Sequence, residues 1–280
     1  MAQNVRWKHP DGAGGFTELN LPSSAEIVEY NGSTVKNELD NLSATTGVSA
    51  FMRRLLRAND AVEARSLLKV GREDIFDETG NRWNSLSACP DTSIKKFGAK
   101  SLHTPGSGYL IKPTGLTLGG KNFAIAFWAY APSASTAAQA LCSLGTNKNS
   151  IKIFRDSSNK LTTSCAENGS FVFSPASDER VTFPTAQWNH VELDFNYSSG
   201  RIYLFLNGSL VCSTTACTLF STAQAFPFYI GYDIYSASYY FNGYIDEILV
   251  TEKLLHTANF TPPSAPYDLD SDTLALLHFD

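Results

Sequence analysis

Two acidic side chains and an amide occupy alternate positions in one short segment, Glu192-Leu193-Asp194-Phe195-Asn196. In a strand, residues at i, i+2 and i+4 lie on one face, so Glu192, Asp194 and Asn196 are brought together. A pair of carboxyl groups on one face is what a glycosidase uses to cleave a glycosidic bond. A third acid is missing, because the Asn196 amide cannot exchange a proton as a carboxyl group does. We therefore interpret Glu192 and Asp194 as the solvated outer face of a strand, and expect no catalytic residue.

A second acidic position suggests a metal. In the segment Gly243 to Val250, alternation places Asp246 on the same strand face as Ile248 and Val250. If that face is the core, a buried carboxylate needs a cation or several hydrogen bonds. Calcium binds carboxylate and carbonyl oxygens, and the turn at Asp77 could supply a further ligand. The alternative is that backbone amides of a neighbouring loop satisfy Asp246, and no other cofactor is expected.

Tyrosines crowd into sixteen residues late in the chain. They are Tyr229, Tyr232, Tyr235, Tyr239, Tyr240 and Tyr244. A tyrosine offers a flat apolar ring and a hydroxyl group, which suits a sugar ring or a protein surface. Because Ser236-Ala237-Ser238 is typical of a loop, we expect Tyr235, Tyr239 and Tyr240 to be exposed and to bind carbohydrate. Tyr229 and Tyr244 are better explained by core or interface packing.

The whole-chain composition excludes several other classes. The net charge of -5 provides no basic surface for nucleic acid, and no apolar run is long enough to insert into a membrane. No Gly-x-Ser-x-Gly nucleophile motif and no phosphate-binding loop are present. The N-terminal residues lack the apolar region of a signal peptide, which predicts synthesis in the cytoplasm. The five cysteines are then expected to be mostly buried free thiols, although Cys212 and Cys217 are close enough in sequence to bridge a hairpin.

The elements that must position these residues are strands. The apolar run Phe123 to Tyr130 predicts a strand buried on both faces. The segments 190–196 and 201–206 alternate apolar and polar residues, and Asn207-Gly208 then predicts a tight hairpin. Strand patterns continue to the end of the chain. This pattern predicts an antiparallel β-sandwich over 72–280.

The first part of the chain differs in composition and in its apolar pattern. Residues 1–48 are rich in turn formers and end in one short apolar helical stripe, Val35, Leu39 and Leu42. Residues 49–71 show two further helical patterns, with a break at Asn59-Asp60. One heptad is not stable alone in water. We therefore expect 1–48 to be an N-terminal attachment and oligomerisation segment with coiled and helical character, and 49–71 to be a helical linker.

Six ordered segments of the β region resemble the laminin-G-like, concanavalin A-like lectin domain, a jelly roll. They are Phe76-Asp77-Glu78-Thr79-Gly80-Asn81, Lys96-Phe97-Gly98-Ala99-Lys100-Ser101-Leu102, Phe123-Ala124-Ile125-Ala126-Phe127-Trp128, Trp188-Asn189-His190-Val191, Leu204-Phe205-Leu206-Asn207-Gly208 and Gly243-Tyr244-Ile245-Asp246-Glu247-Ile248. The family usually opens with an apolar strand, Leu-Leu-Leu-His-Phe-Asp. Here the same motif closes the chain at 274–280. We expect this terminal segment to fill the slot of the missing first strand, in its own chain or in a neighbouring subunit.

Asn259-Phe260-Thr261-Pro262-Pro263 resembles the version of this domain that is common in phage and prophage proteins. Phe16-Thr17-Glu18-Leu19-Asn20 and the stretch 55–65 resemble segments near the start of phage tail-fibre chains. The resemblance implies a phage or prophage virion protein, released by lysis, that forms a homotrimer with other virion proteins as partners and binds bacterial surface polysaccharide. One alternative is a purely structural tail or decoration protein with no ligand. A glycoside hydrolase is the least favoured, because the third acid is absent.

Overall fold

The computed structural model describes residues 75–280, except 147, 174–179, 216–217 and 237, and four short strands before them. The chain divides into two compact units, Met1–Arg72 and Glu73–Asp280. In the described part of the chain, no helix is long and apolar enough to cross a membrane.

In the first unit, the described residues form two strand pairs. Strand β1 (Arg6–Pro10) pairs with β2 (Phe16–Asn20), and β3 (Glu29–Tyr30) pairs with β4 (Ser33–Thr34), both antiparallel. The turn signals in the sequence fall between these strands. The helices expected after residue 34 lie outside the described residues.

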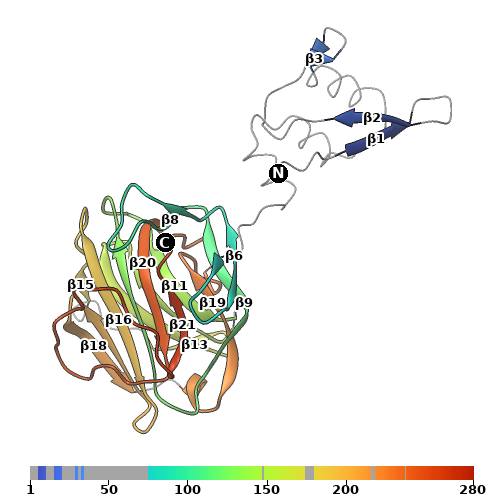
Figure 1. The fold of residues 1–280 in the computed structure, drawn as a ribbon. Helices are drawn as coiled ribbons and strands as arrows, with labels where there is room; N and C mark the ends of the chain where they lie inside the picture. The colour runs from blue at the N-terminus through green and yellow to red at the C-terminus, as the bar shows by residue number, and fades with distance from the viewer. Residues whose placement is uncertain are drawn as a thin grey trace. The chain divides into compact units, whose positions relative to one another are not determined.

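The second unit consists of two antiparallel sheets (Figure 1). The eight-stranded sheet contains, in order, β18 (Ser209–Thr215), β17 (Arg201–Leu206), β16 (Trp188–Asn196), β10 (Phe123–Tyr130), β20 (Asn242–Thr251), β8 (Ser101–Pro105) and β7 (Cys89–Asp91), with β21 (Thr273–Leu277) also paired to β20. The nine-stranded sheet contains β14 (Ser170–Phe173), β13 (Lys160–Glu167), β12 (Ser150–Arg155), β11 (Gln139–Gly145), β19 (Gln224–Ile230), β9 (Tyr109–Leu118), β6 (Arg82–Leu86) and β5 (Ile75–Phe76), with β15 (Val181–Thr182) paired to β13. The predicted β-sandwich is therefore confirmed.

A single apolar core draws on both sheets. Phe127 and Leu193 contribute from the eight-stranded sheet, and Ile153 and Phe228 contribute from the nine-stranded sheet. Each alternates along its strand with a residue that points to the outer face. Burial of one such side chain stabilises the fold by about 1.5–3 kcal/mol. The alternation along each strand therefore determines which side chains lie on the outer face of its sheet.

The hairpin predicted at Asn207-Gly208 joins β17 to β18. Both residues have positive φ angles, 50° and 78°, as a tight two-residue turn requires. A side chain at Gly208 has no room, because a Cβ there would lie 2.0 Å from the carbonyl oxygen of Phe260. The Gly208 carbonyl also accepts a hydrogen bond from Phe260 N at 2.9 Å. The hairpin therefore docks the segment that follows β20.

The C-terminal strand β21 pairs with β20 within its own chain, as Figure 1 shows. The carbonyl of Leu276 accepts a hydrogen bond from Glu78 N at 2.8 Å, and Asp280 Oδ1 accepts one from Ala99 N. Ala275, Leu276 and Leu277 are buried. The terminal apolar motif is therefore a strand of the sheet. It pairs with the same edge of β20 as β8 does, further along the strand.

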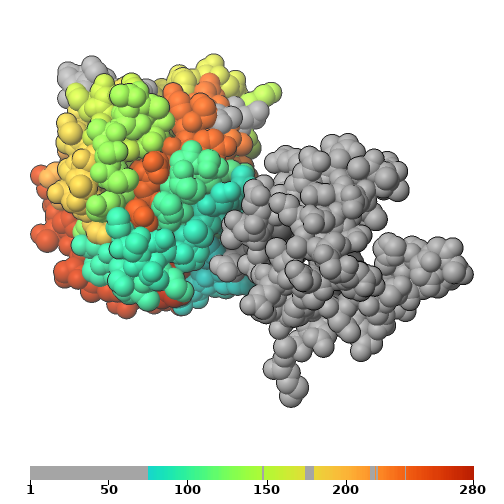
Figure 2. All heavy atoms as spheres, turned by 90° about the horizontal axis from the view of Figure 1, so that it is seen from above, coloured from blue at the N-terminus to red at the C-terminus, as the bar shows by residue number. Residues whose placement is uncertain are grey.

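The space-filling view shows how distant parts of the sequence share one surface. Orange atoms from the region of β19 and β20 lie among teal and yellow-green atoms from much earlier strands (Figure 2). Cys165 departs from the free thiols expected of most cysteines because it is disulfide-bonded, whereas the thiol of Cys142 is free and buried as expected. The segment after β19 passes over this surface and leads to the polar contacts described next.

Candidate functional site

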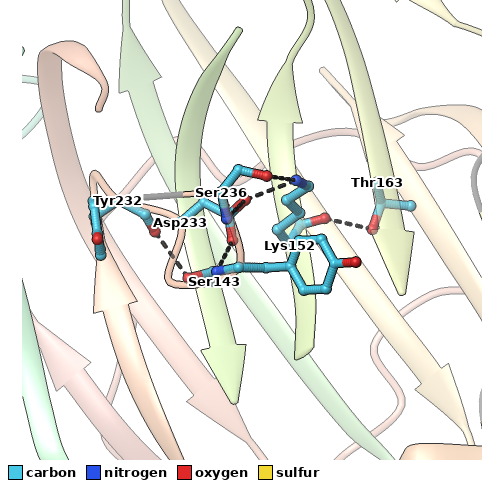
Figure 3. Close-up of polar contacts among 7 residues, drawn as sticks. Ser143, Lys152, Thr163, Tyr232, Asp233 and Ser236 are labelled. Carbon is cyan, nitrogen blue, oxygen red and sulfur yellow. Dashed lines mark hydrogen bonds and ion pairs between the residues drawn. The ribbon is translucent and has the colours of Figure 1, made fainter. Parts of the chain in front are cut away.

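The loop 231–241 connects β19 to β20 and lies over the outer face of the nine-stranded sheet. Its centre is a buried ion pair between Lys152 of β12 and Asp233 of the loop, with Nζ and Oδ2 2.7 Å apart (Figure 3). Lys152 is 4% exposed and Asp233 is 0% exposed. Because Ile151 and Ile153 point into the core, the alternation of β12 directs Lys152 outward to the loop.

Asp233 also fixes the shape of the loop. Its Oδ1 accepts a hydrogen bond from Tyr235 N at 3.0 Å, and its Oδ2 accepts one from Ser236 N at 3.1 Å. Lys152 Nζ donates a second bond to Ser236 Oγ at 3.2 Å. Ser143 Oγ of β11 donates to the carbonyl of Tyr232 at 2.8 Å, as Figure 3 also shows. The loop is therefore fastened to the sheet at three successive points.

Four aromatic rings surround the ammonium group of Lys152. The distances from Nζ to the ring centroids are 4.8 Å for Tyr239, 4.9 Å for Phe154, 5.5 Å for Phe171 and 5.8 Å for Tyr235. These separations are within the range of cation–π attraction. Phe171 is 55% exposed and packs on Tyr235 with ring centroids 4.8 Å apart. The rings therefore hold the cation on one side and offer apolar surface to solvent on the other.

A second aromatic cluster lies beside the first. Tyr232 stacks on Tyr109 of β9 at 4.7 Å and contacts Tyr240 at 4.8 Å and Tyr229 at 5.7 Å. Burial among these phenol groups raises the pKa of Tyr232 above its ordinary value. Tyr232 therefore stays uncharged at neutral pH, and the cluster packs the base of the loop.

The three tyrosines expected to bind carbohydrate do come together in this loop, but they are only partly exposed. Tyr235, Tyr239 and Tyr240 are each half-buried. They are less exposed than expected because the Asp233 contacts draw the loop onto the sheet. Phe171 extends the same surface, but the sequence analysis did not identify it. Its position in the short exposed strand β14 is the one feature that indicates it. The arrangement offers flat rings and hydroxyl groups for a sugar or a protein surface.

The two aspartates considered for calcium hold separate loops. Asp77 accepts hydrogen bonds from Thr79 N, Asn81 N and Trp83 Nε1, all between 2.8 and 3.0 Å. Asp246 is 0% exposed and accepts bonds from Lys96 N at 2.9 Å and Phe97 N at 3.3 Å, in agreement with the alternative of satisfaction by backbone amides. The pair therefore forms no shared ligand set in the described contacts, and calcium there stays a prediction.

The face predicted for Asp246 is wrong. It pairs with Trp128, which points away from the core, whereas Ile248 and Val250 belong to the core. A β-bulge causes the shift: Glu247 has a positive φ of 52°, and the register with β10 changes at this point. One additional residue moves the preceding side chain to the opposite face.

The prediction that Glu192 and Asp194 are solvated is also wrong. They share the outer face of the eight-stranded sheet, but they are only 1% and 0% exposed. The segment after β20 covers them, and Leu255 N donates to Asp194 Oδ1 at 2.6 Å. His256 Nδ1 lies 2.6 Å from Glu192 Oε1. Burial raises the pKa of both carboxyl groups above their ordinary values.

Comparison with known proteins places the sandwich in one family. Residues 104–259 match the family model described as the concanavalin A-like lectin/glucanases superfamily. A search of curated proteins found no match.

Two solved structures share the architecture. One is domain 4 of AbnA, a GH43 extracellular arabinanase from Geobacillus stearothermophilus, in complex with arabinotriose. It has a TM-score of 0.51 and 19% identity, over 65% of this chain and 89% of that one. The other is tailspike protein 2 from Escherichia coli O157:H7 bacteriophage CAB120, with a TM-score of 0.53 and 10% identity, over 71% of this chain and 29% of that one. At these identities the likeness concerns the fold alone.

The ion pair beneath the tyrosine loop can be tested by removing its cation. Replacing Lys152 with Met leaves the Asp233 carboxylate buried without a counter-charge, which is expected to lower the free energy of unfolding by about 3–5 kcal/mol. Chemical denaturation measures the loss. The double variant Lys152→Met/Asp233→Asn should recover part of the stability, because no lone charge remains. Additive losses in the double variant would contradict this account.

The buried carboxyl group of Asp246 should make stability depend on pH. Burial raises its pKa from 3.8 to about 7, and the nearby Glu247 adds to the shift, while the amides of Lys96 and Phe97 oppose it. Between these values the folded chain keeps a proton that the unfolded chain releases. The stabilisation is therefore complete below pH 3.8 and is lost as the pH rises through 7, with a slope approaching about 1.4 kcal/mol per pH unit.

Comparison with Asp246→Asn isolates this contribution. Denaturation midpoints of both proteins are measured from pH 4 to pH 8. The difference in unfolding free energy between wild type and variant should fall with pH in this range. Two parallel curves would show that Asp246 has the same pKa in the folded and unfolded chains.

Proposed function

This chain belongs to the concanavalin A-like lectin/glucanases superfamily, and from that membership we propose that its β-sandwich binds a bacterial surface glycan without cleaving it. The binding surface is the face of Tyr235, Tyr239 and Tyr240 with Phe171 beside them. The observation that carries this proposal is a loop of half-exposed aromatic rings fastened to the sheet by the Lys152–Asp233 ion pair.

Preorganisation supports binding by this face. A loop that is already held in place loses little conformational entropy when a ligand binds. The rings of Tyr239 and Phe171 are positioned by the same cation, so they keep a fixed relation to each other. Half-exposed rings present one face and a hydroxyl edge to solvent, which matches the alternating apolar and polar surface of a sugar. The structure of the arabinanase domain of similar fold is a complex with arabinotriose.

The absence of hydrolysis is proposed from the position of the acids. A glycosidase needs two carboxyl groups that flank the bond of a bound sugar. Glu192 and Asp194 are buried beneath Leu255 and His256, and Asn196 stands where a third acid is needed. A sugar would have to displace the covering segment to reach them.

We also propose that the protein is a phage or prophage tail component. The support is the resemblance of 16–20 and 55–65 to the start of tail-fibre chains and of 259–263 to the version of this domain common in phage and prophage proteins. A phage tailspike shares the fold of the sandwich. A virion role suits a glycan-binding face, because a tail protein must contact the host surface.

Glycan binding can be measured on an array of bacterial surface polysaccharides. The full chain should bind at least one of them, and Tyr239→Ala and Tyr240→Ala should each weaken that binding about 10-fold, a loss of about 1.4 kcal/mol. Tyr197→Ala is the matched control, since Tyr197 is 45% exposed after β16 on the other sheet. If the chain binds no glycan, the structural role without a ligand is favoured. If Tyr197→Ala weakens binding as much as the two loop variants do, the binding site is not on the tyrosine face.

A virion fibre role also predicts a homotrimer. The N-terminal unit, Met1–Arg72, is proposed to drive assembly. Sedimentation equilibrium of the full chain should then give three times the 30.6 kDa chain mass. A monomer mass at micromolar concentration would contradict the trimer and leave the glycan proposal unaffected.

A further inference from the structure

A polar cluster on the outer face of the eight-stranded sheet remains outside the proposed glycan site. Glu192 and Asp194 come from β16 at positions i and i+2, and His256 comes from the segment after β20. One ligand atom from each of the three residues lies within 4.8 Å of the other two. In the described part of the chain, this is the only group of three acidic, histidine or cysteine residues that meets that distance.

The hydrogen bonds of the cluster leave one oxygen unused. Asp194 Oδ1 accepts bonds from Leu255 N at 2.6 Å and His256 N at 3.2 Å, so the carboxylate has a fixed orientation. Asp194 Oδ2 is buried and has no hydrogen-bond partner. A buried carboxylate oxygen without a partner costs free energy. At neutral pH a proton shared with the buried Glu192 carboxyl group can satisfy this oxygen, and a metal ion can displace that proton.

The protein supplies little positive charge at this point. Within the described residues, no lysine or arginine forms an ion pair with Glu192 or Asp194, and the imidazole of His256 is the one basic group in contact. His256 stacks on Phe260 with ring centroids 3.6 Å apart and an interplanar angle of 6°. Phe260 is itself hydrogen-bonded to Gly208. The imidazole is thereby oriented, and its side chain is 37% exposed, which leaves an entry path for an ion.

The donor set determines the class of ion. Calcium and magnesium prefer all-oxygen shells, whereas an imidazole nitrogen combined with two carboxylates suits zinc and similar transition metals. We propose that Glu192, Asp194 and His256 bind one divalent transition metal ion, of which Zn²⁺ is the probe. The metal displaces the proton between His256 Nδ1 and Glu192 Oε1, which is released to water, and these two atoms move apart to reach metal–ligand distances of about 2 Å. Asp194 Oδ2 completes three protein ligands. Water fills the remaining position.

A neighbouring pair provides an internal control. His278 Nδ1 lies 2.8 Å from Glu247 Oε1, so it repeats the contact between an imidazole and a buried carboxylate. Glu247 Oε2 accepts a hydrogen bond from Tyr267 N at 3.0 Å, and the pair is not part of a three-residue ligand group in the described chain. Substitution of His278 therefore perturbs a similar structure without removing a proposed ligand.

The test is isothermal titration of the full chain, free of affinity tags, with ZnCl₂ alone and with CaCl₂ alone. Wild type and His278→Gln should bind one zinc ion per chain with equal affinity, and calcium should bind more weakly. Asp194→Asn and His256→Gln should each weaken zinc binding more than about 10-fold, since even loss of a group that supports a ligand has that effect.

Thermal unfolding provides a second measurement for variants that bind poorly. Zinc should raise the unfolding midpoint of wild type and His278→Gln, because a ligand that binds only the folded state stabilises it. The same zinc concentration should raise the midpoints of Asp194→Asn and His256→Gln less than that of wild type. The proposal is overturned by no zinc binding to wild type, by unchanged zinc affinity in both ligand variants, or by tighter binding of calcium. Because the cluster and the tyrosines lie on different sheets, none of these results depends on glycan binding.

Discussion

Burying a charged side chain is favourable only when a partner is buried with it, and both outer faces of this sandwich are organised by that requirement. On the nine-stranded sheet, Lys152 points away from the core and is covered by a loop that brings Asp233. On the eight-stranded sheet, Glu192 and Asp194 are covered by a segment that brings His256 and two backbone amides. Each covering segment therefore has a specific place on its sheet, because only there are the buried groups paired.

The two faces differ in how completely this requirement is met. Lys152 and Asp233 balance each other, and the surrounding aromatic rings add further attraction for the ammonium group. On the eight-stranded face, the cluster of Glu192, Asp194 and His256 has two acids for one imidazole, and one carboxylate oxygen has no hydrogen-bond partner. A balanced face can hold a recognition loop rigidly. The unbalanced face is incomplete, and for that reason we place a metal ion there.

The sequence predicts the strands well because their information is local. The alternation at 190–196 and the Asn207-Gly208 turn specify β16, β17 and their hairpin without reference to any other part of the chain. It predicts the outer faces poorly because their information is not local. Alternation shows that Glu192 and Asp194 share a face, but it cannot show that Leu255 and His256 cover that face.

Asp246 and the tyrosines show two further limits. The bulge at Glu247 reverses the face of Asp246, and no turn residue in the sequence marks it. Tyr235, Tyr239 and Tyr240 were grouped correctly in one loop, but their half-burial depends on Lys152, some eighty residues earlier. The superfamily match at 104–259 covers strands β9 to β20, whereas the contacts that pair the buried charges lie between strands and loops.

The way β21 is held has a consequence for the folding pathway. Thr79 and Asn81 donate hydrogen bonds to the carbonyl of Leu274 across 195 and 193 residues of chain. Such long loops must close before these contacts can form, so they belong to the late, slow steps expected of high-contact-order β proteins. Joining 75 and 280 through a short linker and opening the chain elsewhere, as in circular permutation, would turn these distant contacts into near neighbours and should accelerate closure of the sheet.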